Sequence, residues 1–440
     1  MITQTTAPAV EAQKQPRSKP SWDRELIAIA IIYFVQGAMG LAQLAVSFFL
    51  KDELHLGPAE VASLVGIAML PWTIKPFYGL ISDSLPILGY HRRPYILISS
   101  LLATTAWLTL AFWVKSPAAA TCAIALTSLA IACSDAITDA VVVERARHES
   151  ISEAGSLQSF SWAATSLGGI LAAYLGGILL EKFGSHVVFA ITGALPLLAS
   201  LASFAIREQN ELRVARVWQN QLAQLRQAFT SKQIILPAAF VFLWQATPTA
   251  DSAFFFFTTN ELHFNPEFLG RVQLVSSIAG LFGVWLFQRY LKTIPMRQIF
   301  VWTTLISTVL GLSSLMLVTH VNRQLGIDDR WFSMGDNLIL SVAGRIAFMP
   351  VLVLAARLCP AGVEATLFAS LMSIFNLAGL CSYQLGALLT HLLGITESNF
   401  DQLWLLVLVT NLSTLLPLPL IRWLPEQQPD PNSANSPELS

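Results

Sequence analysis

Long apolar stretches alternate with short polar connections along the chain. A helix that crosses a lipid bilayer needs roughly 20 predominantly apolar residues. Stretches of about that length occur at residues 25–50, 61–82, 95–114, 118–143, 155–180, 185–206, 233–257, 267–288, 298–319, 338–358, 366–393 and 403–421. The pattern therefore predicts an all-α membrane protein with about twelve transmembrane helices.

The longest polar interruption, residues 207–232, divides these stretches into two blocks of six. Within it, Leu212, Leu222, Leu225 and Phe229 recur at roughly helical spacing, which favours an amphipathic helix at the inner lipid surface. Binding of a partner is the alternative role for this segment. We expect two six-helix halves at residues 25–206 and 233–422, a cytoplasmic linker at 207–232, and disordered cytoplasmic tails at 1–24 and 423–440.

The composition supports a membrane location and excludes some classes of function. The 440-residue chain is 54% hydrophobic and 12% charged, whereas soluble domains are about 25% charged. A formal net charge of −1 provides no basic field for a nucleic acid. Cys122, Cys133, Cys359 and Cys381 show neither paired nor metal-binding spacing, so we expect free thiols.

The distribution of Lys and Arg predicts the orientation of the chain. With the N-terminus inside, most Lys and Arg of the connections fall on the inner side, as the positive-inside rule requires. Residues 1–24 contain no apolar core of the kind found in cleaved secretory signals. We therefore expect a multi-pass membrane protein with both termini cytoplasmic, and the short N-terminal tail favours a bacterial plasma membrane over a plastid membrane.

Familiar catalytic and nucleotide-binding motifs are missing from the sequence. It contains no P-loop, HExxH or GxSxG pattern, and its 7 His are scattered singly. The pair Gly335 and Asp336 resembles the Gly-Asp of intramembrane aspartyl proteases, but the rest of that motif is absent, and we place the pair in an outer connection. We expect no enzymatic activity, no cofactor and no bound metal.

Ionisable side chains inside apolar helices are candidates for function, because each is costly in lipid unless it is paired or hydrated. Asp135 and Asp139 are four residues apart in the fourth predicted helix and therefore share one face. Lys75, in the inner half of the second helix, is their candidate partner. The two carboxylates either bind a solute or only pair with basic groups such as Lys75.

Neutral amides offer further hydrogen bonds to a polar solute. Gln36 and Gln43 lie seven residues apart on one face of the first helix, and Gln245 lies in the seventh. Hydrogen bonding between helices is the alternative role for these side chains.

Small residues recur every four positions at Gly169, Ala173 and Gly177 in the fifth helix. Such spacing permits close approach of a second helix. We expect these residues to pack and assign them no part in coupling.

The second half carries three more charges in or near its helices. Asp251 follows a helix-weakening Thr-Pro pair in the seventh helix, and Arg271 lies near the outer end of the eighth. These two either form an outer gate pair or are each exposed to water. Arg345 lies deeper, in the tenth helix, where a guanidinium needs an anion beside it. Asp251 or a substrate carboxylate would serve.

Two motifs carry a family resemblance. The run KPFYGLISDSLPILGYHRRPY contains Gly79 and Asp83 followed by Arg92 and Arg93, and with the six-plus-six layout it resembles the opening motif of the major facilitator superfamily. Its longer spacing, together with SDAITDAVVVERAR in the fourth helix, resembles the folate-biopterin transporter family. The motifs cover only residues 71–95 and 134–147, and His91 departs from the arginine of many members.

The resemblance implies the major facilitator fold and transport of folates or related pterins by alternating access, coupled to protons. Asp135 is expected to accept the amino and ring N–H groups of a pterin, and Arg345 to bind the glutamate carboxylates of folate. Trp72, Trp162 and Trp244 are available to stack on the ring. The full set of expected substrate-binding residues is Gln36, Gln43, Lys75, Asp135, Asp139, Gln245, Asp251 and Arg345.

Gating is assigned to the residues at the ends of helices that must separate, namely Gly79, Asp83, Arg92, Arg93, Glu144, Arg145 and Arg271. We expect a monomer in the lipid bilayer whose partners are the substrate and protons, without nucleic acid. A major facilitator carrier of a sugar, amino acid or drug is the first alternative. A membrane receptor that has lost transport is the second.

Overall fold

The computed structural model describes residues 24–146, 151–208, 231–291, 294–357 and 364–425. Within these ranges the regular structure is helical, apart from an isolated bridge between Ile87 and Tyr90. Nearly all of the predicted tails and of the predicted linker lies outside the described residues, so those predictions are not tested.

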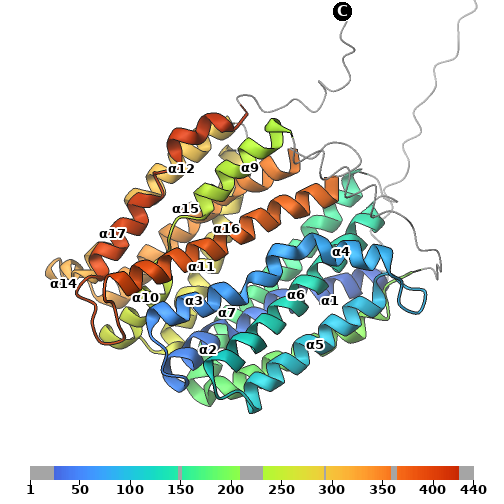
Figure 1. Ribbon diagram of the computed structural model, residues 1–440, viewed down its shortest axis with the longest axis horizontal. Coiled ribbons are helices and arrows are strands. Elements are labelled where there is room, and N and C mark those ends of the chain that lie inside the picture. Colours follow the sequence, from blue (N-terminus) through green and yellow to red (C-terminus); the bar gives the residue numbers. More distant parts are fainter. Residues whose placement is uncertain (1–23, 147–150, 209–230, 292–293, 358–363, 426–440) are drawn as a thin grey trace, which may run out of the picture.

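The first half consists of helices that run back and forth along one direction (Figure 1). They are α1 (Arg24–Ala38), η1 (Met39–Ala42), α2 (Gln43–Phe48), η2 (Phe49–Glu53), α3 (Pro58–Ala68), η3 (Leu70–Ile74), α4 (Lys75–Ser84), α5 (Arg93–Phe112), α6 (Pro117–Ala146) and α7 (Ile151–Ser203). The largest buried apolar cluster lies mainly in this half, also includes Phe256 of the second half, and contains Phe49 and Phe189, whose ring centroids are 5.4 Å apart.

The second half repeats this arrangement with more interruptions. Its helices are α9 (Lys232–Gln245), α10 (Asp251–Phe256), η4 (Phe257–Glu261), α11 (Pro266–Leu286), η5 (Phe287–Leu291), α12 (Met296–Gly311), α13 (Ser314–Val318), α14 (Val321–Gln324), α15 (Asp329–Arg357), α16 (Glu364–Leu392), α17 (Leu403–Ser413) and η6 (Leu418–Trp423).

Within the described residues, 10 helical segments are long and apolar enough to cross a membrane. One of them, Ser159–Ser203, has 45 residues and contains Gly184 at φ 76°, a backbone conformation that favours glycine. The segment from Lys232 to Glu261 is not among the 10, and residues 246–250 interrupt its helix. If the two sides of Gly184 and this interrupted segment each count as a span, the total is twelve, which stays a prediction.

Prolines explain two breaks that matter for function. Proline has no N–H to donate and its ring clashes with the preceding helical turn, so helices break before Pro71 and Pro248 and begin again beyond them. Pro76 stands in the first turn of α4, where it is tolerated. Lys75 is consequently the first residue of α4, and Asp251 the first residue of α10.

One expectation about the second half is wrong. Asp336 lies inside α15, not in an outer connection, because α15 begins at Asp329 and not near residue 338. Neighbouring protein satisfies the polar groups of this extension: Arg323 pairs with Asp329 at 2.7 Å, and the Ser314 hydroxyl donates to Asp336 at 2.7 Å. Paired in this way, polar residues extend a membrane helix beyond its apolar stretch.

The two halves contact each other along α16 and where α7 meets α11. Figure 1 shows α16 beside α3 and α4, and α7 packs on α11. A Cβ atom at Gly177 would lie 2.4 Å from the Pro266 carbonyl oxygen and 2.8 Å from the Gly270 Cα. The close packing predicted from the small residues is thus confirmed at Gly177, whereas a Cβ at Gly169 would have nothing within 4 Å.

Candidate functional site

An ionic cluster joins α4 and α6 in the first half. Lys75 forms ion pairs with Asp135 and with Asp139, the latter with 2.9 Å between Nζ and Oδ2. The Tyr33 hydroxyl of α1 donates to Asp139 Oδ1 at 2.7 Å. The four-residue spacing thus places both carboxylates on one face, as predicted, and the break at the start of α4 positions Lys75 between them.

The members of this cluster differ in their exposure. The side chains of Lys75 and Asp135 are 16% and 19% exposed, whereas that of Asp139 is 46% exposed. Two carboxylates face a single ammonium group, so the cluster carries a net charge of −1 when all three groups are ionised. A second positive charge or a bound proton would neutralise it.

A second ionic network lies in and around the connection between α4 and α5. Arg92 pairs with Asp83 at 2.6 Å and with Glu144 of α6, and it donates to the Ser82 hydroxyl at 2.7 Å. Burial disfavours the charged form of Arg92, but the hydrogen bond and charge of Glu144 and the charge of Asp83 raise its pKa above the usual value. These residues come from the first half.

Arg93 and Arg145, two other gating candidates, also contact residues of the first half. Arg93 donates to the Ile206 carbonyl at 2.5 Å, and Arg145 pairs with Glu25 at 3.2 Å. The Glu208 carboxylate accepts hydrogen bonds from the backbone N–H groups of Arg92 at 2.8 Å and Arg93 at 3.1 Å. Sequence reasoning missed Glu208, although its place just after the sixth helix, opposite a basic pair, was a usable signal. Gly79 lies in open space, since a Cβ there would have no neighbour within 4 Å.

The first-helix amides behave differently from each other. Gln43 accepts a hydrogen bond from Gln273 of α11 at 2.7 Å, which joins the two halves. The buried Nε2 of Gln36 has no hydrogen-bond partner among the described residues. Ser63 and Gln384 form a further contact between the halves, at 2.9 Å.

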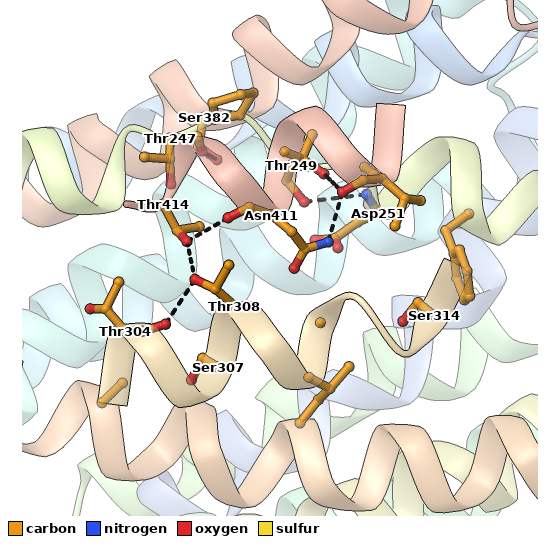
Figure 2. A pocket seen from close by; sticks show the side chains of 18 of the residues that line it. Thr247, Thr249, Asp251, Thr304, Ser307, Thr308, Ser314, Ser382, Asn411 and Thr414 are labelled. Carbon is orange, nitrogen blue, oxygen red and sulfur yellow. Dashed lines mark hydrogen bonds between the residues drawn. The ribbon is translucent and has the colours of Figure 1, made fainter. Parts of the chain in front are cut away.

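A polar cavity of about 450 Å³ lies within the second half. Residues of α9, α10, α12, α13, α15, α16, α17 and the break at 246–250 line it, and Figure 2 shows their hydroxyl, amide and carboxylate groups facing one another. Gln245, Asp251, Asp336, Asn337 and Asn411 are among them. This cavity unites two predicted residues, Gln245 and Asp251, with Asp336, whose role the sequence did not reveal.

The charged side chains that line the cavity are all acidic. Among the described residues that line it there is no Lys, Arg or His. Asp336 is 9% exposed and accepts hydrogen bonds from the hydroxyls of Ser313 and Ser314, whereas Asp251 is exposed. The cavity therefore presents carboxylate, hydroxyl and amide groups without a basic counter-ion.

Helix α16 contacts the helix interruption at residues 246–250, which lines this cavity. The Ser382 hydroxyl donates to the Thr247 carbonyl at 2.5 Å. A Cβ at Gly386 would lie 2.1 Å from the Thr249 carbonyl oxygen, so only glycine permits this approach. The Asp251 backbone N–H donates to the Thr249 hydroxyl at 3.2 Å and starts α10.

The two arginines expected beside Asp251 lie elsewhere. Arg271 pairs with Glu267 and is 60% exposed; a pair with Asp251 is not formed. Arg345 is exposed and packs its side chain against Gly280 and Gly283 of α11. Among the described residues, Arg345 has no ion pair or hydrogen bond, and it does not line the cavity.

Comparisons with known proteins agree with one another. The BT1 family profile matches residues 36–438. A folate-biopterin transporter of Synechocystis sp. is 55% identical over 420 residues, covering 93% of this chain and 83% of that protein. Folate transporter 2 of Plasmodium falciparum is 30% identical over 412 residues, covering 94% and 90%.

Solved structures show the same architecture at low sequence identity. The nucleoside transporter NupG is 14% identical, with a TM-score of 0.68, over 90% of this chain and 98% of that one. A D-xylose-proton symporter is 14% identical, with a TM-score of 0.67, over 91% and 98%. These likenesses show the major facilitator fold.

Proposed function

The chain belongs to the BT1 family, and on this premise we propose that it is a secondary transporter that carries folates and related pterins across a membrane by alternating access, coupled to protons. Its fold and its relatives are those of membrane transporters and not of enzymes. The observation that carries the choice of substrate is the 55% identity to a folate-biopterin transporter over 93% of the chain.

The packing of the halves supports alternating access. Gly177 against Gly270 and Gln43 against Gln273 join the halves at one end. At the other end, the network of Asp83, Arg92 and Glu144 links helices of the first half. Halves that are joined at one end and internally braced at the other are suited to rocking about a central site.

The cluster of Lys75, Asp135 and Asp139 supports proton coupling. One ammonium group can neutralise one carboxylate, so the second carboxylate gains from binding a proton in low dielectric. Asp139 is the more exposed of the two and is the one that meets water. Because the carboxylates share Lys75, we assign the coupled proton to the pair and not to either residue.

The proposed setting is a bacterial plasma membrane, with a monomer whose termini are both cytoplasmic. The excess of Lys and Arg on the connections of that side supports this orientation. The network around Arg92 then lies at the cytoplasmic end, and the contact of Gly177 with Gly270 at the outer end.

Uptake of radiolabelled folic acid into proteoliposomes tests the proposal. We expect uptake that exceeds protein-free liposomes and rises when the outside is acidic, because protons then enter with the substrate. Asp135→Asn and Asp139→Asn should each flatten the pH profile, whereas Asp401→Asn, an exposed carboxylate outside both sites, should not.

Different results would contradict transport, the choice of substrate and the assignment of the coupled proton. No uptake and no counterflow by the well-folded protein would favour a receptor, and uptake of another solute that folate does not inhibit would favour a different carrier. A pH profile unchanged in both Asn variants would move the coupled proton to other residues.

A further inference from the structure

We propose that the cavity in the second half receives the pterin ring of the substrate and excludes its carboxylate end. This inference rests on the proposed function and deepens it, since it assigns one end of the substrate to one set of residues. Asp251 and Asp336 are the recognition groups, and Trp244 is the aromatic surface. Figure 2 shows Asp251 among hydroxyl-bearing residues of the lining.

The acidic lining of the cavity suits the ring end of a folate better than its glutamate end. A folate has N–H donors at its ring end and carboxylates at the other end. The cavity contains two carboxylates and, among its described lining residues, no basic side chain. A glutamate carboxylate entering it would find no cation to pair with, whereas the amino and ring N–H groups of a pterin would donate hydrogen bonds to the aspartates.

The size of the cavity and the indole ring of Trp244 suit a flat two-ring ligand. Its volume of about 450 Å³ lies within the roughly 300–1,000 Å³ of small-molecule sites, and it holds a two-ring pterin. Trp244 lines one side, and its indole N–H donates to the Thr304 hydroxyl at 3.2 Å. Its ring also meets Phe300 edge-on at 5.6 Å. An indole fixed in this way offers a flat surface for stacking at little entropic cost.

The hydrogen bonds of the lining residues also favour a polar ligand in this cavity. The hydroxyls of Ser313 and Ser314 hold Asp336 in place, so the carboxylate is oriented before a ligand arrives. The buried hydroxyl oxygen of Ser307 lines the cavity and has no hydrogen-bond partner among the described residues. Buried polar atoms without partners are costly, and a polar ring beside Ser307 would remove that cost.

The ionic cluster of the first half is a weaker ring site. Lys75 already pairs with both Asp135 and Asp139. A pterin would have to displace an ammonium group from Asp135, whereas Asp251 and Asp336 have no such competitor among the residues lining the cavity. The two proposals together place ring recognition in the second half and proton coupling in the first.

Competition by the two ends of the substrate tests this inference. Full-length protein in proteoliposomes takes up radiolabelled folic acid, and inhibition is measured with a simple pterin and with p-aminobenzoylglutamate. Asp251→Asn and Asp336→Asn should each weaken inhibition by the pterin about tenfold or more, because a charge-assisted hydrogen bond is lost. Inhibition by p-aminobenzoylglutamate should change less than about twofold.

Controls separate recognition from folding and from the proposed function. Asp401→Asn, on an exposed connection of the same half, should behave as wild type, and thermal unfolding in detergent checks each variant. If the Asp336→Asn protein does not fold, the Asp251→Asn protein, which is changed at an exposed position, tests the inference alone. Unchanged pterin inhibition in a folded Asp251→Asn protein, or equal weakening for both inhibitors, overturns the inference. If wild-type protein transports neither folate nor pterin, the proposed function itself fails, and the inference with it.

Discussion

Single charged residues in this protein are distinguished by whether they have partners. Lys75 has two carboxylate partners and Arg92 has Asp83 and Glu144. Arg345 has no ion pair or hydrogen bond among the described residues, although it lies within a membrane-spanning helix. A guanidinium there stays charged and favours an anion beside it, and a carboxylate of the proposed substrate would supply one.

Replacing Arg345 should therefore reduce the uptake of folate more than the uptake of a simple pterin. Arg345→Gln is expected to reduce folate uptake about tenfold, because the ion pair to the glutamate end is lost, and to change uptake of a simple pterin less than about twofold. Uptake of both labelled compounds into proteoliposomes measures this. Arg330→Gln, on the same helix but at its exposed end, is the matched control. Equal losses for both substrates would show that Arg345 is a structural residue.

At the scale of elements, breaks and glycines position the sites. Proline-induced breaks make Lys75 and Asp251 the first residues of α4 and α10. Gly386 lets α16 approach the carbonyl of Thr249. The contact of α7 with α11 depends in the same way on Gly177 and Gly270, whose backbones meet without side chains.

A side chain at Gly177 should hold the halves apart at this end. Gly177→Val would place its Cβ 2.4 Å from the Pro266 carbonyl oxygen, so we expect the population to shift towards the state that is open here. Spin labels at Asp52 and Glu397, exposed residues of opposite halves, should report a longer distance. Gly169→Ala, in the same helix but in open space, should leave the distances unchanged. If Gly177→Val also leaves them unchanged, this contact does not control closure.

At the scale of the whole molecule, orientation decides which state the structure represents. The halves are joined at the end that contains Gly177 and Gly270. If that end is extracellular, as the Lys and Arg distribution predicts, this state is closed to the outside.

Labelling from the two sides of the membrane measures the orientation. Leu88, between α4 and α5, is 86% exposed, and Leu325, between α14 and α15, is 61% exposed. In a variant without the natural cysteines, Leu88→Cys should react with a membrane-impermeant maleimide in inverted vesicles, and Leu325→Cys in right-side-out vesicles. The reverse pattern would invert the predicted topology.

The sequence by itself determined the class of the protein and the faces of its helices. Lipid offers no hydrogen bonds to the backbone, so long apolar stretches must be helices, and helical periodicity alone places Asp135 and Asp139 on one face. The motif around Gly79, Asp83, Arg92 and Arg93, together with the run SDAITDAVVVERAR in the fourth helix, was sufficient to recognise the family. These inferences depend on local sequence, and local sequence is enough for them.

Only the tertiary structure decided which distant residues meet. Glu208 reaches the backbone of Arg92 and Arg93, and Asp336 lies in a membrane helix because Ser313 and Ser314 satisfy it. Arg271 pairs with Glu267 instead of Asp251. The cavity itself forms where several helices of the second half converge. Such contacts depend on the packing of helices far apart in the chain, and hydropathy along the sequence carries no information about that packing.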